Sequence, residues 1–152
     1  MKTGDKAKEF TLKNSEGNDV SLTDLLADGK LVLLFFPLAY SGICTEEMCT
    51  MRDNMKSYNS LNTNVAAISV DSFFTLREFK KANNLNFTLL SDFNKEVSVD
   101  YGVLNDDFFG MKGVAKRSAF VINKDKTIEY AEILEDAGNL PDFRAIQKAL
   151  MN

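Results

Sequence analysis

Two cysteines, Cys44 and Cys49, are the only thiols in this chain of 152 residues. They follow an apolar run, Leu31 to Phe36, which ends at Pro37 and is succeeded by a short turn containing Ser41. This order predicts a buried strand that delivers Cys44 to the first turn of a helix. Free backbone N–H groups and the helix dipole stabilise a thiolate there, so Cys44 is a candidate nucleophile. The alternative is an unreactive buried thiol, because free cysteine also packs as a small hydrophobic residue.

The chain contains no histidine. Its absence excludes Ser–His and Cys–His catalysis and every histidine-ligated metal site. Two cysteines alone cannot complete a zinc site, so no metal is expected. Activation of a thiol must therefore come from arginine, lysine, hydroxyl groups or backbone dipoles.

Composition predicts one globular domain, residues 1–152, with 45% apolar and 26% charged residues. The net charge of -4 argues against nucleic acid or an anionic membrane as a main partner. The N-terminus lacks the apolar core of a signal peptide, and no apolar run is long enough to span a bilayer. We expect a cytoplasmic protein, in which a disulfide is usually transient and catalytic or redox-sensing.

The order of apolar patterns predicts an α/β fold, with a mixed central sheet flanked by helices and an N-terminal hairpin. The predicted strands are 10–12, 19–21, 31–36, 65–70, 88–90, 118–122 and 128–133. The predicted helices are 21–26, 43–60, 76–83, 95–101 and a last one that Pro141 opens. Two aromatic pairs, Phe73–Phe74 and Phe108–Phe109, are predicted in loops, either as core residues or, if exposed, as part of a substrate pocket or a dimer contact.

A family resemblance rests on Pro37, Ser41 and Cys44, which reproduce the P-x-x-x-[TS]-x-x-C motif of peroxiredoxins. Phe35–Cys44 resembles most the AhpE type, which usually has threonine at the position of Ser41. The second cysteine, Cys49, is similar to that of the PrxQ type, also called bacterioferritin comigratory protein. The resemblance covers nearly the whole chain and implies a thioredoxin-like fold.

The resemblance implies a role for each matching residue. Cys44 would be the peroxidatic cysteine, Pro37 would shield its thiolate from water, and the Ser41 hydroxyl would hydrogen-bond the thiolate and the peroxide. Arg117 lies in a stretch similar to the family's G-x-A-x-R motif and would stabilise the thiolate and polarise the peroxide. Glu47 would orient that arginine. Without the resemblance, Pro37 simply ends a strand, Arg117 is an edge residue and Glu47 is a favourable charge near a helix start.

Cys49 allows two interpretations. In an intact helix five residues advance ~7.5 Å and rotate ~140° beyond a full turn, so the Cα atoms lie past the ~7 Å limit for a disulfide. A Cys44–Cys49 bond therefore requires the first helical turn to unwind, which the resemblance to PrxQ implies. Otherwise Cys49 is a packed thiol in a one-cysteine enzyme that an external thiol recycles.

The expected function is a thiol peroxidase that reduces hydrogen peroxide or organic hydroperoxides through a sulfenic acid, without a cofactor. A thioredoxin- or glutaredoxin-like donor would reduce the Cys44–Cys49 disulfide. A thiol–disulfide oxidoreductase is a weak alternative, because its C-x-x-C motif is absent and no proline lies between Pro37 and Pro141. A non-catalytic redox sensor is a second alternative, and the sequence leaves open whether the chain forms a homodimer.

Overall fold

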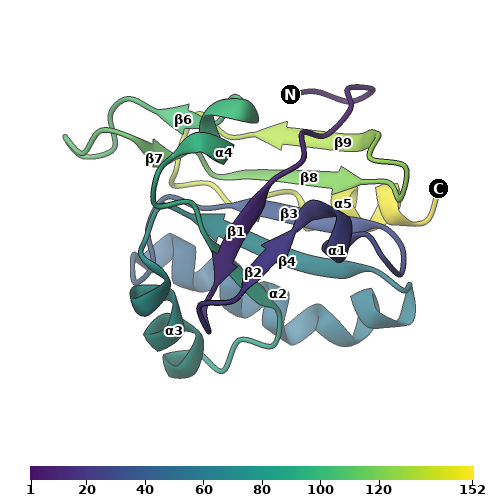
Figure 1. Ribbon diagram of the computed structural model, residues 1–152, viewed down its shortest axis with the longest axis horizontal. Coiled ribbons are helices and arrows are strands. Elements are labelled where there is room, and N and C mark those ends of the chain that lie inside the picture. The colour runs from purple at the N-terminus through teal and green to yellow at the C-terminus, as the bar shows by residue number, and fades with distance from the viewer.

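The computed structural model describes residues 1–152, which fold around a seven-stranded mixed sheet in the order β2-β1-β5-β4-β3-β8-β9 (Figure 1). The strands of this sheet are β1 (Thr11–Asn14), β2 (Asp19–Ser21), β3 (Leu31–Phe35), β4 (Asn64–Ser69), β5 (Thr88–Ser91), β8 (Ser118–Ile122) and β9 (Ile128–Ile133). A separate two-stranded pair consists of β6 (Leu104–Asn105) and β7 (Val114–Ala115). The helices are α1 (Leu22–Leu25), α2 (Gly42–Ser60), α3 (Phe73–Ala82), α4 (Glu96–Asp100) and α5 (Phe143–Leu150).

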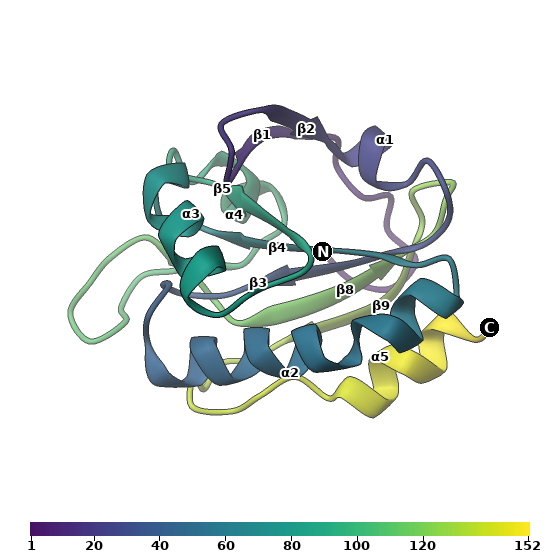
Figure 2. The ribbon, with the colours of Figure 1, turned by 90° about the horizontal axis from the view of Figure 1, so that it is seen from below.

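The central strand β3 is buried on both faces, as a strand with helices above and below it must be. Val32 and Leu34 enter one core cluster, which also takes residues from α2, α3 and α5. Leu33 and Phe35 enter the other, which takes residues from α1, α4 and the N-terminal segment. Figure 2 shows α2 and α5 lying together beneath the sheet, on the face opposite β1 and α1. The sheet thus fixes the start of α2 against a rigid layer.

Strand pairing decides which chain segments meet at the end of β3. β3 runs parallel to β4 and antiparallel to β8, and Phe35 pairs with Ser118. The residue before β8, Arg117, therefore lies at the same edge of the sheet as the turn that leads from β3 into α2. This pairing brings Arg117 to the first turn of a helix more than seventy positions earlier in the sequence.

The predicted mixed sheet, flanking helices and N-terminal β1–β2 hairpin are confirmed. The prediction of a loop at Phe73–Phe74 was wrong, because both residues open α3. The helix starts there because the Ser72 side chain accepts a hydrogen bond from the Thr75 N–H and caps the first turn. Phe108–Phe109 does lie in the connection between β6 and β7, as predicted.

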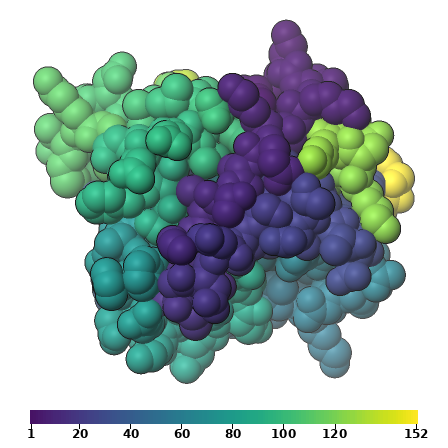
Figure 3. All heavy atoms as spheres, viewed as in Figure 1, coloured from purple at the N-terminus to yellow at the C-terminus, as the bar shows by residue number.

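The start of the last helix was also predicted wrongly. Pro141 does not open α5, because Asp142 is its N-cap and accepts a hydrogen bond from the Ala145 N–H. The pair β6–β7 was not predicted, since two residues in each strand are too few to show an alternating pattern. The connection between these strands, green in the figures, projects from the body of the molecule (Figure 3).

Candidate active site

The first turn of α2 presents unpaired backbone N–H groups beside Cys44. Ser41 is the N-cap residue and makes no side-chain cap hydrogen bond, and the Thr45 N–H is the first to bond back, to the Ser41 carbonyl. The N–H groups of residues 42–44 therefore have no partner within the helix. Cys44 is the third residue of α2 and is fully buried. This is a position where a thiolate is stabilised.

The predicted hydrogen bond from Ser41 to the thiolate is not present in this structure. The Ser41 Oγ donates instead to the Leu38 carbonyl at 3.1 Å, which uses its single proton to close the turn before α2. Pro37 is buried, two residues after the end of β3. Ser41 still borders the cavity described below.

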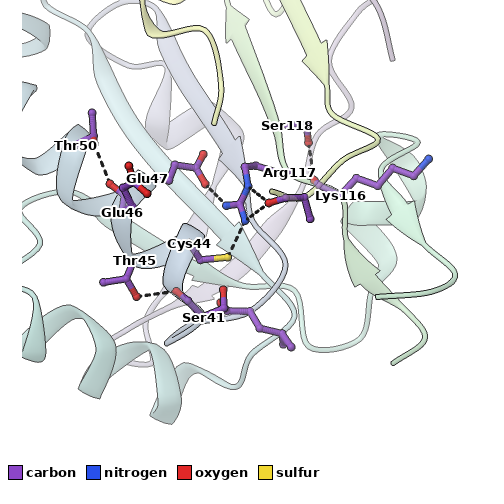
Figure 4. Close-up of polar contacts among 11 residues, drawn as sticks. Ser41, Cys44, Thr45, Glu46, Glu47, Thr50, Lys116, Arg117 and Ser118 are labelled. Atoms are coloured by element: carbon purple, nitrogen blue, oxygen red, sulfur yellow. Dashed lines mark hydrogen bonds and ion pairs between the residues drawn. The ribbon is translucent and has the colours of Figure 1, made fainter. Parts of the chain in front are cut away.

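Arg117 contacts two of the other predicted site residues, Cys44 and Glu47. Its Nη2 donates to the Cys44 Sγ at 3.3 Å, and its Nη1 donates to the Glu47 Oε1 at 2.7 Å (Figure 4). All three side chains are almost completely buried. Lys116, in contrast, points away from the sulfur and pairs with Glu135 at 3.1 Å (Figure 4). The guanidinium is thus the cation nearest the sulfur.

A backbone carbonyl fixes the remaining face of the guanidinium. The Ala137 oxygen accepts hydrogen bonds from Arg117 Nε at 3.3 Å and from Nη2 at 3.1 Å. Burial by itself lowers the pKa of Arg117, but the negative charges of Glu47 and Cys44 outweigh that effect and raise it overall. Arg117 therefore stays charged. Sequence reasoning missed Ala137, because a main-chain carbonyl carries no residue-type signal.

Glu47 is a buried acid with one unpartnered oxygen. Its side chain has no solvent exposure, and its Oε2 accepts no hydrogen bond. Burial raises the pKa of Glu47 to about 7, although Arg117 acts in the opposite direction. Glu132 adds a smaller repulsion that also raises this pKa. The Arg117 guanidinium therefore donates hydrogen bonds to two acidic groups, the Glu47 carboxyl group and the Cys44 thiol.

Asp71, which sequence reasoning also missed, fixes the turn between β3 and α2. Its Oδ2 accepts hydrogen bonds from the Ala39 N–H and from the Ser69 hydroxyl, both at 2.7 Å. Burial raises the pKa of Asp71, and these hydrogen bonds partly oppose that rise. The turn is therefore tied to the end of β4. Its only sequence signal is its place directly after a buried strand.

A cavity of about 760 Å³ opens onto this site. Ser41, Gly42 and Ile43 from the start of α2 form one side, and Arg117 forms part of its lining. Residues of the β6–β7 connection and of the loop after β9 complete the walls. No cluster of three or more acidic, cysteine or histidine side chains is placed to hold a metal ion. None of the helices is both long and apolar enough to cross a membrane.

Cys49 lies apart from this cluster. It is partly exposed, and its Sγ lies 3.8 Å from the Asn83 Oδ1 at the end of α3. Both cysteines are free, and α2 runs without interruption through both of them. The structure therefore shows the reduced form, in which the two thiols are not bonded to each other.

Comparisons with known proteins show the family of the chain. The AhpC/TSA family model matches residues 3–131. Peroxiredoxin Bcp of Escherichia coli is 35% identical over 133 residues, which cover 86% of this chain and 84% of that protein. A chloroplastic 2-cysteine peroxiredoxin of Chattonella marina is 32% identical over 160 residues, which cover 99% of this chain and 77% of that protein.

Solved structures give the same result. Peroxidoxin BcpB from Mycobacterium tuberculosis superposes with a TM-score of 0.87 at 32% identity, covering 99% of this chain and 95% of that one. A peroxiredoxin-like protein from Aquifex aeolicus, at 22% identity, shares the fold with a TM-score of 0.89. The predicted thioredoxin-like fold is confirmed. The chain belongs to the AhpC/TSA family, and it is a peroxiredoxin, a thiol peroxidase among the oxidoreductases.

Proposed function

We propose that this chain acts as a single domain that reduces a hydroperoxide through a sulfenic acid on Cys44. The observation that carries the proposal is the 3.3 Å contact between the Cys44 Sγ and the Arg117 Nη2, at the uncapped start of α2. The sulfur has a permanent cation on one side and free N–H groups on its own helix turn. Both favour the thiolate, which is the nucleophilic form of cysteine.

In the first step the Cys44 sulfur attacks the terminal peroxide oxygen. The S–O bond forms as the O–O bond breaks, so sulfur is oxidised and the leaving oxygen departs as water or an alcohol after taking up a proton. Negative charge moves from sulfur to the leaving oxygen during this step. Arg117 and the N–H groups of residues 42–44 would stabilise that charge. Pro37 would limit water at the sulfur, and Glu47 would hold Arg117 in orientation.

In the second step Cys49 would attack the Cys44 sulfenic acid and release water, which leaves a disulfide. Because both residues lie within the continuous helix α2, the first turns of that helix must unwind before the sulfur atoms can meet. A thioredoxin- or glutaredoxin-like dithiol would then reduce the disulfide. This sequence of steps would give the chain an antioxidant role.

Mass spectrometry after one equivalent of peroxide tests both steps together. The proposal predicts a mass lower by two hydrogens in the parent and a trapped sulfenic acid in Cys49→Ser. Amide hydrogen exchange between Cys44 and Cys49 should be faster in the oxidised parent than in the reduced parent. If the parent protein accumulated only sulfenic acid, and amide hydrogen exchange did not become faster, the chain would instead be a one-cysteine enzyme recycled by an external thiol.

The non-catalytic redox sensor is separated by a simpler measurement. Purified protein with a thiol donor and no other partner should consume peroxide continuously. A sensor would react once and stop. Membership of the AhpC/TSA family supports the enzyme, since the Arg117–Cys44 contact would serve the first oxidation step in either case.

A further inference from the structure

The end of α3 contacts α2 beside the second cysteine (Figure 2). Cys49 and Arg52 are three residues apart and therefore share one face of α2. Both contact Asn83, the C-cap residue of α3. The Cys49 Sγ lies 3.8 Å from the Asn83 Oδ1, and the Arg52 Nη1 donates to the Asn83 main-chain carbonyl at 2.6 Å. One residue at the end of α3 thus contacts both the candidate resolving thiol and the turn that follows it.

The orientation of the Asn83 amide determines its effect on Cys49. Its Nδ2 donates to the Phe79 carbonyl at 3.1 Å, so its oxygen is the atom that faces the sulfur. An amide oxygen accepts a hydrogen bond from a thiol but has no proton to donate to a thiolate. The contact therefore favours the protonated form of Cys49, whereas attack on a sulfenic acid requires the thiolate.

Arg52 is bonded at two points to the segment at the end of α3. Besides the bond from its guanidinium to Asn83, its main-chain carbonyl accepts a hydrogen bond from the Asn86 Nδ2 at 3.3 Å. In the same part of α2, Met51 and Met55 are buried in the core cluster that also includes residues of α3. Unwinding of α2 beyond Arg52 would break these bonds and expose both methionines, so it would cost more than unwinding before Arg52.

We propose that Asn83 and Arg52 are positioning residues for the second step of the reaction. Asn83 keeps Cys49 protonated and in place until α2 unwinds, and Arg52 confines the unwinding to the residues that precede it. This inference rests on the proposed resolving role of Cys49 and adds the groups that control it.

The Cys49–Asn83 contact must break before the disulfide forms. The Cys49 thiol loses its proton to water, and the resulting thiolate attacks the Cys44 sulfur. The S–S bond forms as the S–O bond breaks, and the departing hydroxide takes up a proton and leaves as water. The Cys44 sulfur is reduced and the Cys49 sulfur is oxidised, so the step needs no further oxidant or reductant. Because a disulfide has no S–H, the hydrogen bond to Asn83 is lost on every route.

Two variants separate the contact with Cys49 from the role of Asn83 as a helix cap. Asn83→Ala and Asn83→Asp both lose the Nδ2 bond to Phe79, but only the aspartate keeps an oxygen beside Cys49, and this oxygen is charged. The rate constant of the second step should rise about threefold in Asn83→Ala, as for the loss of one ordinary hydrogen bond. In Asn83→Asp it should fall at least about threefold, because a nearby negative charge disfavours a thiolate.

The rate is measured by rapid mixing with one equivalent of hydrogen peroxide, acid quenching and mass spectrometry, in which the disulfide is lighter than the sulfenic acid by one water. Asn54→Ala is the control, because Asn54 is an exposed amide of α2 that bonds to Thr50 and not to Cys49. The same Asn83 variants in a Cys44→Ser background are treated with iodoacetamide. Alkylation of Cys49 should become faster with alanine and slower with aspartate, independently of any reaction with peroxide.

Amide hydrogen exchange of the oxidised protein tests Arg52. In the parent, the region of faster exchange should end before Arg52, and in Arg52→Gln it should extend into residues 53–55. Lys56→Gln is the control, because Lys56 is an exposed cation of the same helix and, unlike Arg52, is not bonded to Asn83. The boundary should stay in place in the control.

Second-step rates that are equal in Asn83→Ala and Asn83→Asp, or that shift in the same direction, would identify Asn83 as a helix cap only and overturn its proposed role. A boundary of exchange that is the same in Arg52→Gln and in the parent would overturn the role of Arg52. Sulfenic acid without any disulfide in the parent would overturn the resolving role of Cys49 itself, and this inference with it. Failure of the proposed function is therefore visible in the parent, whereas failure of this inference alone appears only in the variants.

Discussion

The two thiols of α2 lie five positions apart in identical backbone structure but in opposite surroundings. Cys44 is in the first turn, fully buried, with a guanidinium 3.3 Å from its sulfur. Cys49 lies deeper in the helix, where backbone N–H groups are already bonded, and it is partly exposed beside the neutral amide of Asn83. The helix terminus and one buried cation, and not the helix as such, distinguish a candidate nucleophile from a candidate resolving thiol.

Among the variants of these two thiols and their partners, Cys44→Ser should have the largest effect on activity. The variant should lose measurable consumption of peroxide, because a hydroxyl in this site is not ionised and is a poor nucleophile. Peroxide consumption is measured under pseudo-first-order conditions, and circular dichroism checks that the fold is kept. Second-order reactivity retained in this variant would assign the peroxidatic role to Cys49.

Replacing Arg117 should remove most of the difference between Cys44 and Cys49 in the rate of reaction with peroxide. In Arg117→Ala we expect the reaction with peroxide to slow by at least about 100-fold, in the range seen when one preorganised donor is deleted. Arg117→Lys should recover only part of the rate, because an ammonium cannot replace the two-armed contact to Glu47 and Cys44. The pH dependence of Cys44 alkylation should move to higher pH in both variants. An unchanged profile would mean that another group stabilises the thiolate.

Glu47→Gln should change how stability and the alkylation of Cys44 depend on pH. The pKa of Glu47 is raised to about 7 in the folded protein by burial. The folded state therefore binds a proton more tightly than the unfolded chain, whose glutamate titrates near its ordinary value. The associated stability is fully present at acidic pH and is lost as the pH rises through about 7.

Urea denaturation across this pH range should show that loss in the parent, on the order of 3 kcal/mol, and a smaller slope in Glu47→Gln. The variant should also alkylate Cys44 at lower pH, because the negative charge that competes for Arg117 is gone. Equal pH slopes for parent and variant would mean that Glu47 stays ionised throughout. The reaction of Glu47→Gln with peroxide should slow less than that of Arg117→Ala, since the glutamine side chain can still accept a hydrogen bond from Arg117.

The smallest effect on the first reaction is expected for Cys49→Ser. Because Cys49 contacts neither Cys44 nor Arg117, oxidation by the first equivalent of peroxide should stay within about twofold of the parent rate, as for residues that share no partner. Turnover with thioredoxin should nevertheless stop, and overoxidation should increase. Turnover equal to that of the parent would identify Cys49 as a packing residue.

Sequence patterns correctly predict the main sheet, the N-terminal hairpin, the long helix after β3 and the position of Cys44 in its first turn. Local patterns suffice for these features, because an apolar run, a proline and a capping residue act on their near neighbours. The sequence also indicated Arg117 and Glu47, but only through the family motif. Spacing alone would have placed Arg117 at an exposed edge, whereas it is 1% exposed.

The groups that meet around the Cys44 sulfur are brought together by tertiary contacts. Antiparallel pairing of β8 with β3 brings Arg117 to Cys44, and the loop after β9 supplies the Ala137 carbonyl that holds it. The Ser41 hydroxyl also points toward Leu38, against the expected contact with sulfur. Most of these contacts join segments that are far apart in the chain, and they depend on main-chain carbonyl groups and on side-chain rotamers. A local pattern of residue types contains neither kind of information, so it could not have predicted them.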